Sequence, residues 1–291
     1  MKTIIVPLDF SDESQTGLDL AAMLAKKTGA AIQMVHIISK KDSVTDEKLT
    51  EKEKQKAKDR FKEILARYKQ GRNADCEMDF AVEEGQIFKE ITNFTDKFED
   101  PLTVLSTHGE SGFEELFIGG TAYKIISHSK HPVITTRRSR LSANIDVIVM
   151  PLDITFQTRE KVPYTVELAK QFGSEIHVVT TQLSNLKSIE KKLHTYADQV
   201  INYIRHHGVA FKVKHTHGKN LTDLTLDYSY SVDADLISIM TEQEKNPSNL
   251  LLGNYAHQMI NKSFIPVLSF PNYHLRVVTD DIWTLGAFMP R

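Results

Sequence analysis

The sequence predicts an α/β protein made of two similar units in tandem, and three observations carry this prediction. Short apolar segments rich in Ile and Val alternate with longer amphipathic segments, which is typical of a parallel sheet with helices on both faces. The chain has 291 residues, enough for two domains of ordinary size that each bury a core. The pattern of the first half also returns in the second half in the same order.

The internal repeat is visible in two pairs of stretches. IIVPLDFS at residues 4–11 returns as VIVMPLDIT at residues 147–155, and LFIGGTAYKIISHSKHPVITT returns as LLLGNYAHQMINKSFIPVLSF. Four landmarks pair in chain order: Pro7 with Pro151, Gly29 with Gly173, Gly119 with Gly253, and Pro132 with Pro266. The repeat predicts a first unit over residues 1–139, a second over 144–270, and an extension over 271–291 that has no repeat partner.

Each element of the first unit follows from a local pattern. Residues 2–8 form a short run rich in Ile and Val, which predicts a buried strand. Ser11 is positioned to cap the next helix, with carboxylates in its first turn, and Gly29 is positioned to end that helix. Further strands are expected at residues 31–38, 76–82, 102–106 and 132–135, and further helices around 57–68, at 85–96 and at 122–129.

Composition and charge argue against several classes of function. The formal net charge of −2 provides no broad positive field for nucleic acid or for an anionic membrane. The single cysteine, Cys76, rules out an internal disulfide and is expected to be a packed thiol in a strand, which suits a reducing compartment. No apolar run approaches the ~20 residues of a membrane helix. We therefore expect a cytoplasmic protein that binds neither nucleic acid nor membrane.

A glycine-rich stretch, STHGESGFEELFIGGTAYK at residues 106–124, follows the predicted fourth strand. In parallel sheets, ligands bind beyond the carboxyl ends of the strands, and the N-terminus of the following helix attracts phosphate. Gly119, Gly120 and Thr121 stand at such a helix start. The GxxxxGK[ST], GxGxxG and GxSxG fingerprints are absent. On these residues alone, a plain strand–helix connection and a phosphate loop both remain open.

Three motifs together give the chain a family resemblance. One hydrophobic strand ends in P-x-D-F-S, a second ends in V-H-I, and T-H-G is followed after nine residues by glycine. This combination resembles the universal stress protein family, and the resemblance extends over both units, as in a tandem member. It implies two Rossmann-like (adenine nucleotide alpha hydrolase-like) units with five-stranded parallel sheets, packed as a pseudo-dimer. Many members of this family bind ATP, whereas others bind no nucleotide and pair as dimers.

The resemblance also implies nucleotide-binding roles for residues of the first unit. Pro7, Leu8 and Asp9 would line the adenosine end, with Asp9 near the ribose hydroxyls. The backbone of Ile37, which follows His36, would meet the adenine. The phosphate loop would be made of Leu105, Ser106, Gly109, Gly119, Gly120, Thr121 and Ala122.

Two positions depart from the ATP-binding pattern of the family, which is G-x-x-G, nine residues, then G followed by Ser or Thr. Ser106 replaces the first glycine, and its side chain stands where the backbone would approach phosphate. Gly120 replaces the hydroxyl residue, which costs about 1–2 kcal/mol if that hydroxyl contacts a charged group. Thr121 offers a hydroxyl one position later. These departures weaken the predicted site without removing it.

The second unit departs further from the pattern. Met240 and Gln243 stand at the positions of the two glycines, and Glu242 and Glu244 would repel phosphate. Gly253 remains at the later helix start. We therefore expect the second unit to be a structural partner of a nucleotide-binding first unit.

Other candidate sites have simpler interpretations. His215 and His217 share one face of a predicted strand, but no third ligand with readable spacing accompanies them. Glu114 and Glu115 point in different directions on a helix and suit a solvated surface. His108 has no nucleophile partner that the sequence reveals. The sequence therefore predicts no catalytic residue and no metal ligand.

Two functional hypotheses follow. The first is a stress-response protein whose first unit binds ATP or another adenine nucleotide, with or without Mg²⁺, and hydrolyses it very slowly at most. The second is an interaction or scaffold module of the same fold that binds no nucleotide. Both allow a homo-oligomer and an unidentified protein partner, and neither assigns the protein an enzymatic mechanism. The apolar extension with Trp283 is expected to dock on its own protein or a second copy, or else to bind a partner.

Overall fold

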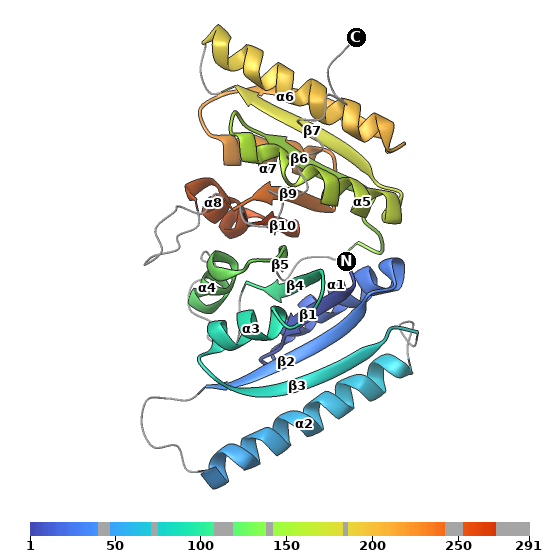
Figure 1. The fold of residues 1–291 in the computed structure, drawn as a ribbon, viewed down its shortest axis with the longest axis vertical. Coiled ribbons are helices and arrows are strands. Elements are labelled where there is room, and N and C mark those ends of the chain that lie inside the picture. The colour runs from blue at the N-terminus through green and yellow to red at the C-terminus, as the bar shows by residue number, and fades with distance from the viewer. Residues whose placement is uncertain are drawn as a thin grey trace. The chain divides into compact units, whose positions relative to one another are not determined.

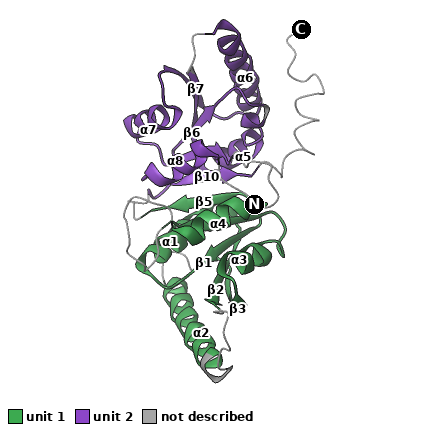
Figure 2. Ribbon diagram, turned by 90° about the vertical axis from the view of Figure 1, so that its left-hand side faces the viewer, with its two compact units in different colours: residues 1–139 green, residues 140–291 purple. Residues whose placement is uncertain are grey.

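The computed structural model describes residues 1–39, 47–70, 75–107, 119–137, 142–182, 186–241 and 253–271. The chain divides into two compact units, Met1–Ser139 and Arg140–Arg291, which have different colours in Figure 2. In each unit, helices connect strands that run in parallel (Figure 1). The prediction of two α/β units in tandem is therefore confirmed.

The first unit alternates strands and helices along its described residues. These elements are β1 (Thr3–Pro7), α1 (Asp12–Thr28), β2 (Ala31–Ser39), α2 (Glu47–Lys69), β3 (Met78–Gly85), α3 (Ile87–Thr95), β4 (Pro101–Ser106), α4 (Gly120–His128) and β5 (Val133–Thr136). The strands lie in the order β3-β2-β1-β4-β5, so the direction of the chain across the sheet reverses between β1 and β4. Because parallel crossovers are right-handed, α1 and α3 cover opposite faces of the sheet, as Figure 2 shows on either side of β1.

The second unit repeats this topology. Its described elements are β6 (Val147–Leu152), the 3₁₀ helix η1 (Phe156–Arg159), α5 (Val162–Phe172), β7 (Glu175–Gln182), α6 (Lys187–His206), β8 (Phe211–His217), α7 (Leu221–Ser231), β9 (Leu236–Met240), α8 (Asn254–Lys262) and β10 (Val267–Phe270). The strands lie in the order β10-β9-β6-β7-β8. Read from β8 to β10, this is the order of the first unit, with β6 in the place of β1 and β9 in the place of β4. The one clear difference is that η1 and α5 together replace the single helix α1.

Both cores are built from central strands that helices cover on two faces. Ile4, Ile5 and Val6 of β1 are fully buried, as are Ile148 and Val149 of β6. Such continuous burial is expected for parallel strands, whose two faces both lie against helices. The central strands therefore form a rigid base, and their carboxyl ends hold the side chains that follow them in fixed positions.

The ends of α1 agree with the sequence prediction. The Ser11 hydroxyl accepts a hydrogen bond from the Ser14 N–H at 3.1 Å, so Ser11 caps the helix. Gly29 ends the helix with a φ of 71°, and Gly173 ends α5 with the same value. This left-handed conformation favours glycine because a Cβ would be strained there.

One strand prediction was displaced. Residues 76–82 were expected to form the third strand, but β3 begins at Met78, which pairs with Ile32, and it continues to Gly85. Cys76 therefore lies just before the strand and not in it. Its thiol is 3.8 Å from the carbonyl oxygen of Ala22, and partial burial raises the pKa of Cys76. The thiol is packed against α1 as expected, although outside the strand.

Candidate functional site

The carboxyl edge of the first sheet contains a cavity of about 350 Å³ beside the point where the strand order reverses. The lining residues are Pro7, Leu8, Asp9, Ser14, Val35, Ile37, Ile87, Ile91, Leu105, Ser106, Thr107, Gly119, Gly120, Thr121, Ala122 and Ile125. Open α/β sheets place ligands at this reversal. The volume lies within the range of about 300–1,000 Å³ that is usual for small-molecule sites.

The structure brings the predicted site residues together at this cavity. Those in the described part of the chain all line it: Pro7, Leu8, Asp9, Ile37, Leu105, Ser106, Gly119, Gly120, Thr121 and Ala122. Gly109, His108, Glu114 and Glu115 lie outside the described residues.

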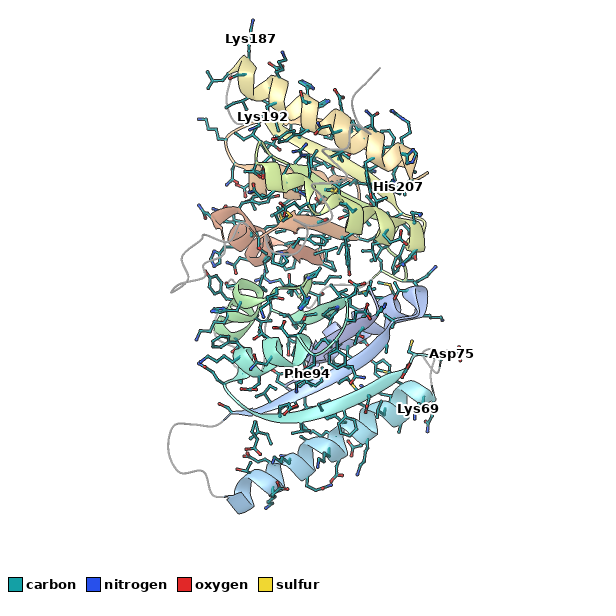
Figure 3. The ribbon with its side chains drawn as sticks, viewed as in Figure 1. Lys69, Asp75, Phe94, Lys187, Lys192 and His207 are labelled. Atoms are coloured by element: carbon teal, nitrogen blue, oxygen red, sulfur yellow. The ribbon has the colours of Figure 1, made fainter. Side chains whose placement is uncertain are left out.

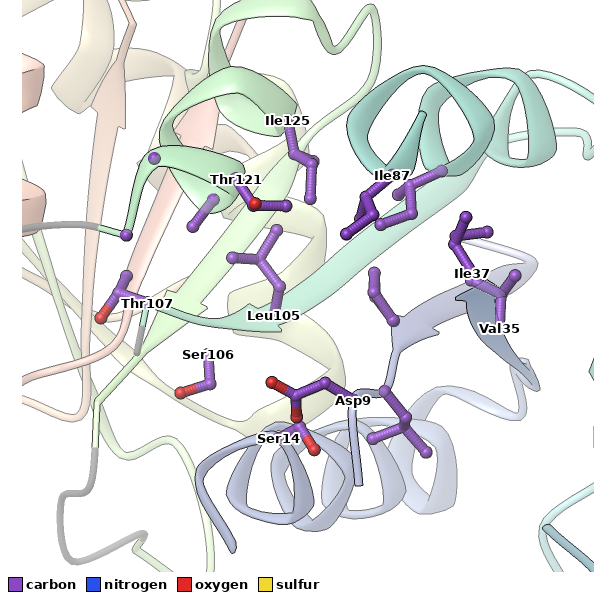
Figure 4. Close-up of a pocket in the computed structure, with 16 residues that line it drawn as sticks. Asp9, Ser14, Val35, Ile37, Ile87, Leu105, Ser106, Thr107, Thr121 and Ile125 are labelled. Atoms are coloured by element: carbon purple, nitrogen blue, oxygen red, sulfur yellow. The ribbon is translucent and has the colours of Figure 1, made fainter. Parts of the chain in front are cut away.

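The cavity has a polar end and an apolar end. Figure 4 shows Asp9, Ser106 and Thr107 towards one end, and Val35 and Ile37 towards the other. Ile37 is buried within β2, so its side chain is held in place by the sheet. The division suits an amphiphilic ligand that has an aromatic or apolar group at one end and a polar group at the other.

Asp9 sits in a tight turn between β1 and α1. Its Oδ1 accepts hydrogen bonds from the Ser11 N–H at 3.0 Å and from the Ser11 hydroxyl at 2.5 Å. Burial alone would raise the pKa of Asp9, but the hydrogen bonds from Ser11 outweigh it, and the pKa is lowered. Phe10, which follows, has a φ of 66°, and its ring packs 4.7 Å from that of His36. The turn thus holds an ionised carboxylate in the lining of the cavity.

The lowered pKa of Asp9 predicts a difference in acid sensitivity between the wild type and Asp9→Asn. A carboxylate with a depressed folded-state pKa contributes stability above the ordinary value of 3.8, and that stability is lost as the pH falls through the lower folded value. The amide of Asn can still accept both hydrogen bonds, but it does not titrate. Between pH 5 and pH 3, the wild type should therefore lose more unfolding free energy than Asp9→Asn, as measured by urea denaturation. Equal losses would contradict this assignment.

The start of α4 forms the opposite wall of the polar end. Gly119 is the N-cap residue, and its N–H donates to the carbonyl of Thr107 at 2.9 Å. A Cβ on Gly119 would lie 3.3 Å from that same oxygen, whereas a Cβ on Gly120 would meet no atom within 4 Å. Gly119 has no side chain with which to cap the helix, and Thr121 lies in the first turn and is not the N-cap residue. The first N–H groups of α4 and the positive end of its dipole are oriented towards the cavity.

Sequence reasoning missed the contribution of α3. Ile87 and Ile91 line the cavity beside Ile37, and both come from the first turns of that helix. Their spacing of four positions predicts one apolar face, but it does not tell what the face covers. That depends on the crossover from β3 to β4, which carries α3 across the sheet to the reversal point.

At the corresponding edge of the second sheet, the residues that the structure describes enclose only a small space. The open volume beside Pro151 and Asp153 is about 10 Å³, although Asp153 accepts the Thr155 N–H at 2.6 Å, just as Asp9 accepts the Ser11 N–H. Met240, expected at a former glycine position, lines this small space. Gln243 and the two expected acidic residues of this loop, Glu242 and Glu244, lie outside the described residues.

The remaining candidates have structural partners. The Nδ1 of His215 is 2.6 Å from the Thr180 hydroxyl, on the neighbouring strand. Among the residues that the structure describes, no three His, Cys, Asp or Glu side chains are grouped to hold a metal ion. Within the same residues, no helix combines the length and apolar character needed to cross a membrane.

Comparisons with known proteins agree with two similar α/β units in tandem. The model of the universal stress protein family matches residues 1–137 and again residues 144–271. A universal stress protein of Methanocaldococcus jannaschii is 23% identical over 145 residues, which cover 48% of this chain and 84% of that protein.

Solved structures show the same fold over nearly the whole chain. A universal stress protein from Archaeoglobus fulgidus matches with a TM-score of 0.75 and 17% identity, and the match covers 93% of this chain and 98% of that one. A universal stress protein solved in complex with cAMP matches 44% of this chain and 98% of its own, with 15% identity and a TM-score of 0.38.

Proposed function

The chain belongs to the universal stress protein family, and from this premise we propose that its first unit binds an adenine nucleotide in the cavity at the carboxyl edge of its sheet. The cavity itself is the main support for this proposal: it has a volume of about 350 Å³, and it extends from an apolar end to the N-terminus of α4. In a stress protein of this kind, nucleotide binding would change how the molecule meets its partners.

The lining of the cavity fits the two parts of a nucleotide. The base would lie between Ile37 and Ile87, in the apolar end, where aromatic surface is removed from water. The ribose hydroxyls would donate to the Asp9 carboxylate, which is ionised at neutral pH because its pKa is lowered. The phosphates would meet the N–H groups at the start of α4, where Gly119 keeps the approach free of a side chain.

Titration calorimetry of the full chain with ATP, ADP, AMP and cAMP, each with and without Mg²⁺, tests this proposal. Binding at one site per chain is the expected result. The difference in binding free energy between ATP and AMP measures what the outer phosphates contribute at α4. A change in ATP affinity when Mg²⁺ is added shows whether the metal accompanies ATP. Absence of heat and of thermal stabilisation up to millimolar nucleotide would overturn the proposal.

Two substitutions at Gly120 should change the ATP affinity in opposite directions. A Cβ there meets no atom within 4 Å, so the first atom of either side chain has room. Gly120→Ser adds the hydroxyl that the family pattern has here, and we expect ATP binding to tighten by about tenfold. Gly120→Asp stabilises the helix start but repels phosphate, and we expect ATP binding to weaken by at least about tenfold. Calorimetry at one ionic strength measures both, and identical affinities would contradict contact between phosphate and α4.

The second candidate function is an interaction module of the same fold that binds no nucleotide. Ser106 favours it, because its side chain lines the polar end of the cavity, where the family pattern has glycine. Ser106→Gly distinguishes the candidates: it should tighten nucleotide binding if the first proposal holds, and it should produce no binding if the second holds.

A further inference from the structure

We propose that the second unit carries its own occupant in the corresponding site: the side chain of Lys161, a cation supplied by the chain itself, fills the space that is open in the first unit. The proposal concerns the second unit alone, and it does not depend on which ligand the first unit binds. It also gives a physical reason for the difference between about 350 Å³ in one site and about 10 Å³ in the other.

The repeat shows which residues correspond. The spacing that separates Pro7 from Pro151 also pairs Gly17 with Lys161. The spacing that separates Gly119 from Gly253 pairs Ser106 with Met240 and Thr121 with Tyr255. Each replacement puts a larger side chain at the same place. The residues around the closed space are Pro151, Leu152, Asp153, Lys161, Leu221, Ile239, Met240 and Tyr255.

Lys161 is buried in the manner of a core residue. It is 1% exposed, and it is among the largest fully buried side chains of the described residues. Its Nζ donates to the Thr158 carbonyl at 2.6 Å and to the Thr158 hydroxyl at 3.2 Å. Lysine is rarely buried unless its ammonium finds acceptors, because desolvating the charge is costly. The hydrogen bonds hold the ammonium beside the turn that contains Asp153, whose N–H also donates to the Thr158 hydroxyl at 3.1 Å.

The local backbone explains how the side chain of Lys161 reaches the site. Gly17 lies inside the continuous helix α1, where a Cβ would make an ordinary contact of 3.5 Å with the Ser106 nitrogen at the end of β4. In the second unit the helix is interrupted, and α5 restarts at Val162 with proline at its beginning. Pro163 cannot continue a helix from the preceding turn because it lacks an N–H. The interruption places Lys161 at the N-cap, with its side chain in the site.

Acetylation of the native full chain tests the burial of Lys161 directly. A water-soluble amine-acetylating reagent is applied, and the modification of each lysine is followed by mass spectrometry. Lys161 should react at least about tenfold more slowly than Lys187 and Lys192, because it reacts only after local opening. These two lysines project from α6 in Figure 3 and are exposed. Equal rates would overturn the proposal.

Chemical replacement of the side chain tests whether it is an occupant. Lys161→Gly removes a butylammonium group at an N-cap position, where glycine is well tolerated. Added n-butylammonium chloride should raise the Tm of Lys161→Gly by about 2–4 °C relative to tetramethylammonium chloride at equal ionic strength. The wild type and Lys161→Met, which keeps the volume but loses the charge, should show no such rise.

The outcomes separate this proposal from the proposed function. No specific effect of n-butylammonium on a folded Lys161→Gly, or an equal effect on the wild type, would overturn the proposal that the side chain is a site occupant. If Lys161→Gly does not fold, the acetylation rates of the wild type decide. Neither measurement contains a nucleotide, so failure of nucleotide binding in the first unit leaves both results interpretable.

Discussion

Replacing Gly17 with lysine should abolish nucleotide binding by the first unit while the unit stays folded. The substitution gives the first unit the residue that occupies the corresponding position of the second. The first atom of the new side chain has room, because a Cβ at Gly17 would lie 3.5 Å from the Ser106 nitrogen, an ordinary contact. The rest of the chain would extend beside Leu105 and Ser106, which line the cavity. We expect the ATP dissociation constant to rise at least about 100-fold, as measured by calorimetry.

Gly17→Ala is the matched control for this prediction. It adds only the Cβ, and we expect its ATP affinity to stay within about threefold of the wild type. Alanine in a helix interior also stabilises by about 0.5–1 kcal/mol relative to glycine, so a general loss of structure is not expected. Equal ATP affinities of Gly17→Lys and Gly17→Ala would contradict the prediction. They would show that the nucleotide does not bind in this cavity or that a lysine at this position does not close it.

Replacing Phe61 with alanine should destabilise the first unit by about 3–5 kcal/mol. Phe61 is 0% exposed and is the main apolar anchor of α2, most of whose other described residues are charged and exposed. Its ring stacks on Phe80 of β3 at 4.7 Å and meets the edge of Phe10 at 5.1 Å. The substitution therefore leaves a void between helix and sheet that the fixed β3 cannot fill. Denaturant unfolding measures the loss.

A phenylalanine at the surface provides the control for Phe61→Ala. Phe264 is 60% exposed, and Phe264→Ala should change stability by no more than about 0.5 kcal/mol. Phe61→Ala should also weaken nucleotide binding. Phe10 belongs to the turn that positions Asp9, and the substitution removes the ring that packs against Phe10. Similar stabilities for Phe61→Ala and Phe264→Ala would contradict the anchoring role.

Local patterns in the sequence were sufficient for much of the fold. Ser11 and Gly29 mark the ends of α1 because capping and left-handed turns depend on the residue itself. The third strand was misplaced by two residues at its start, since Cys76 and Met78 are equally compatible with a strand and only the pairing of Met78 with Ile32 selects the register. Helix α3 could be predicted, but its place beside the cavity could not.

The sequence by itself determined the duplication, the α/β class and the two segments at the carboxyl ends of β1 and β4, because strand periodicity, caps and repeated landmarks are local features. The place of Ile37 at the end of β2 came from the family resemblance. Only the tertiary structure showed which side chains fill the edge of the second sheet. The sequence pattern predicted no role for Lys161 or for Gly17. Their effect depends on how closely each helix passes the sheet, which is a property of packing between segments far apart in the chain.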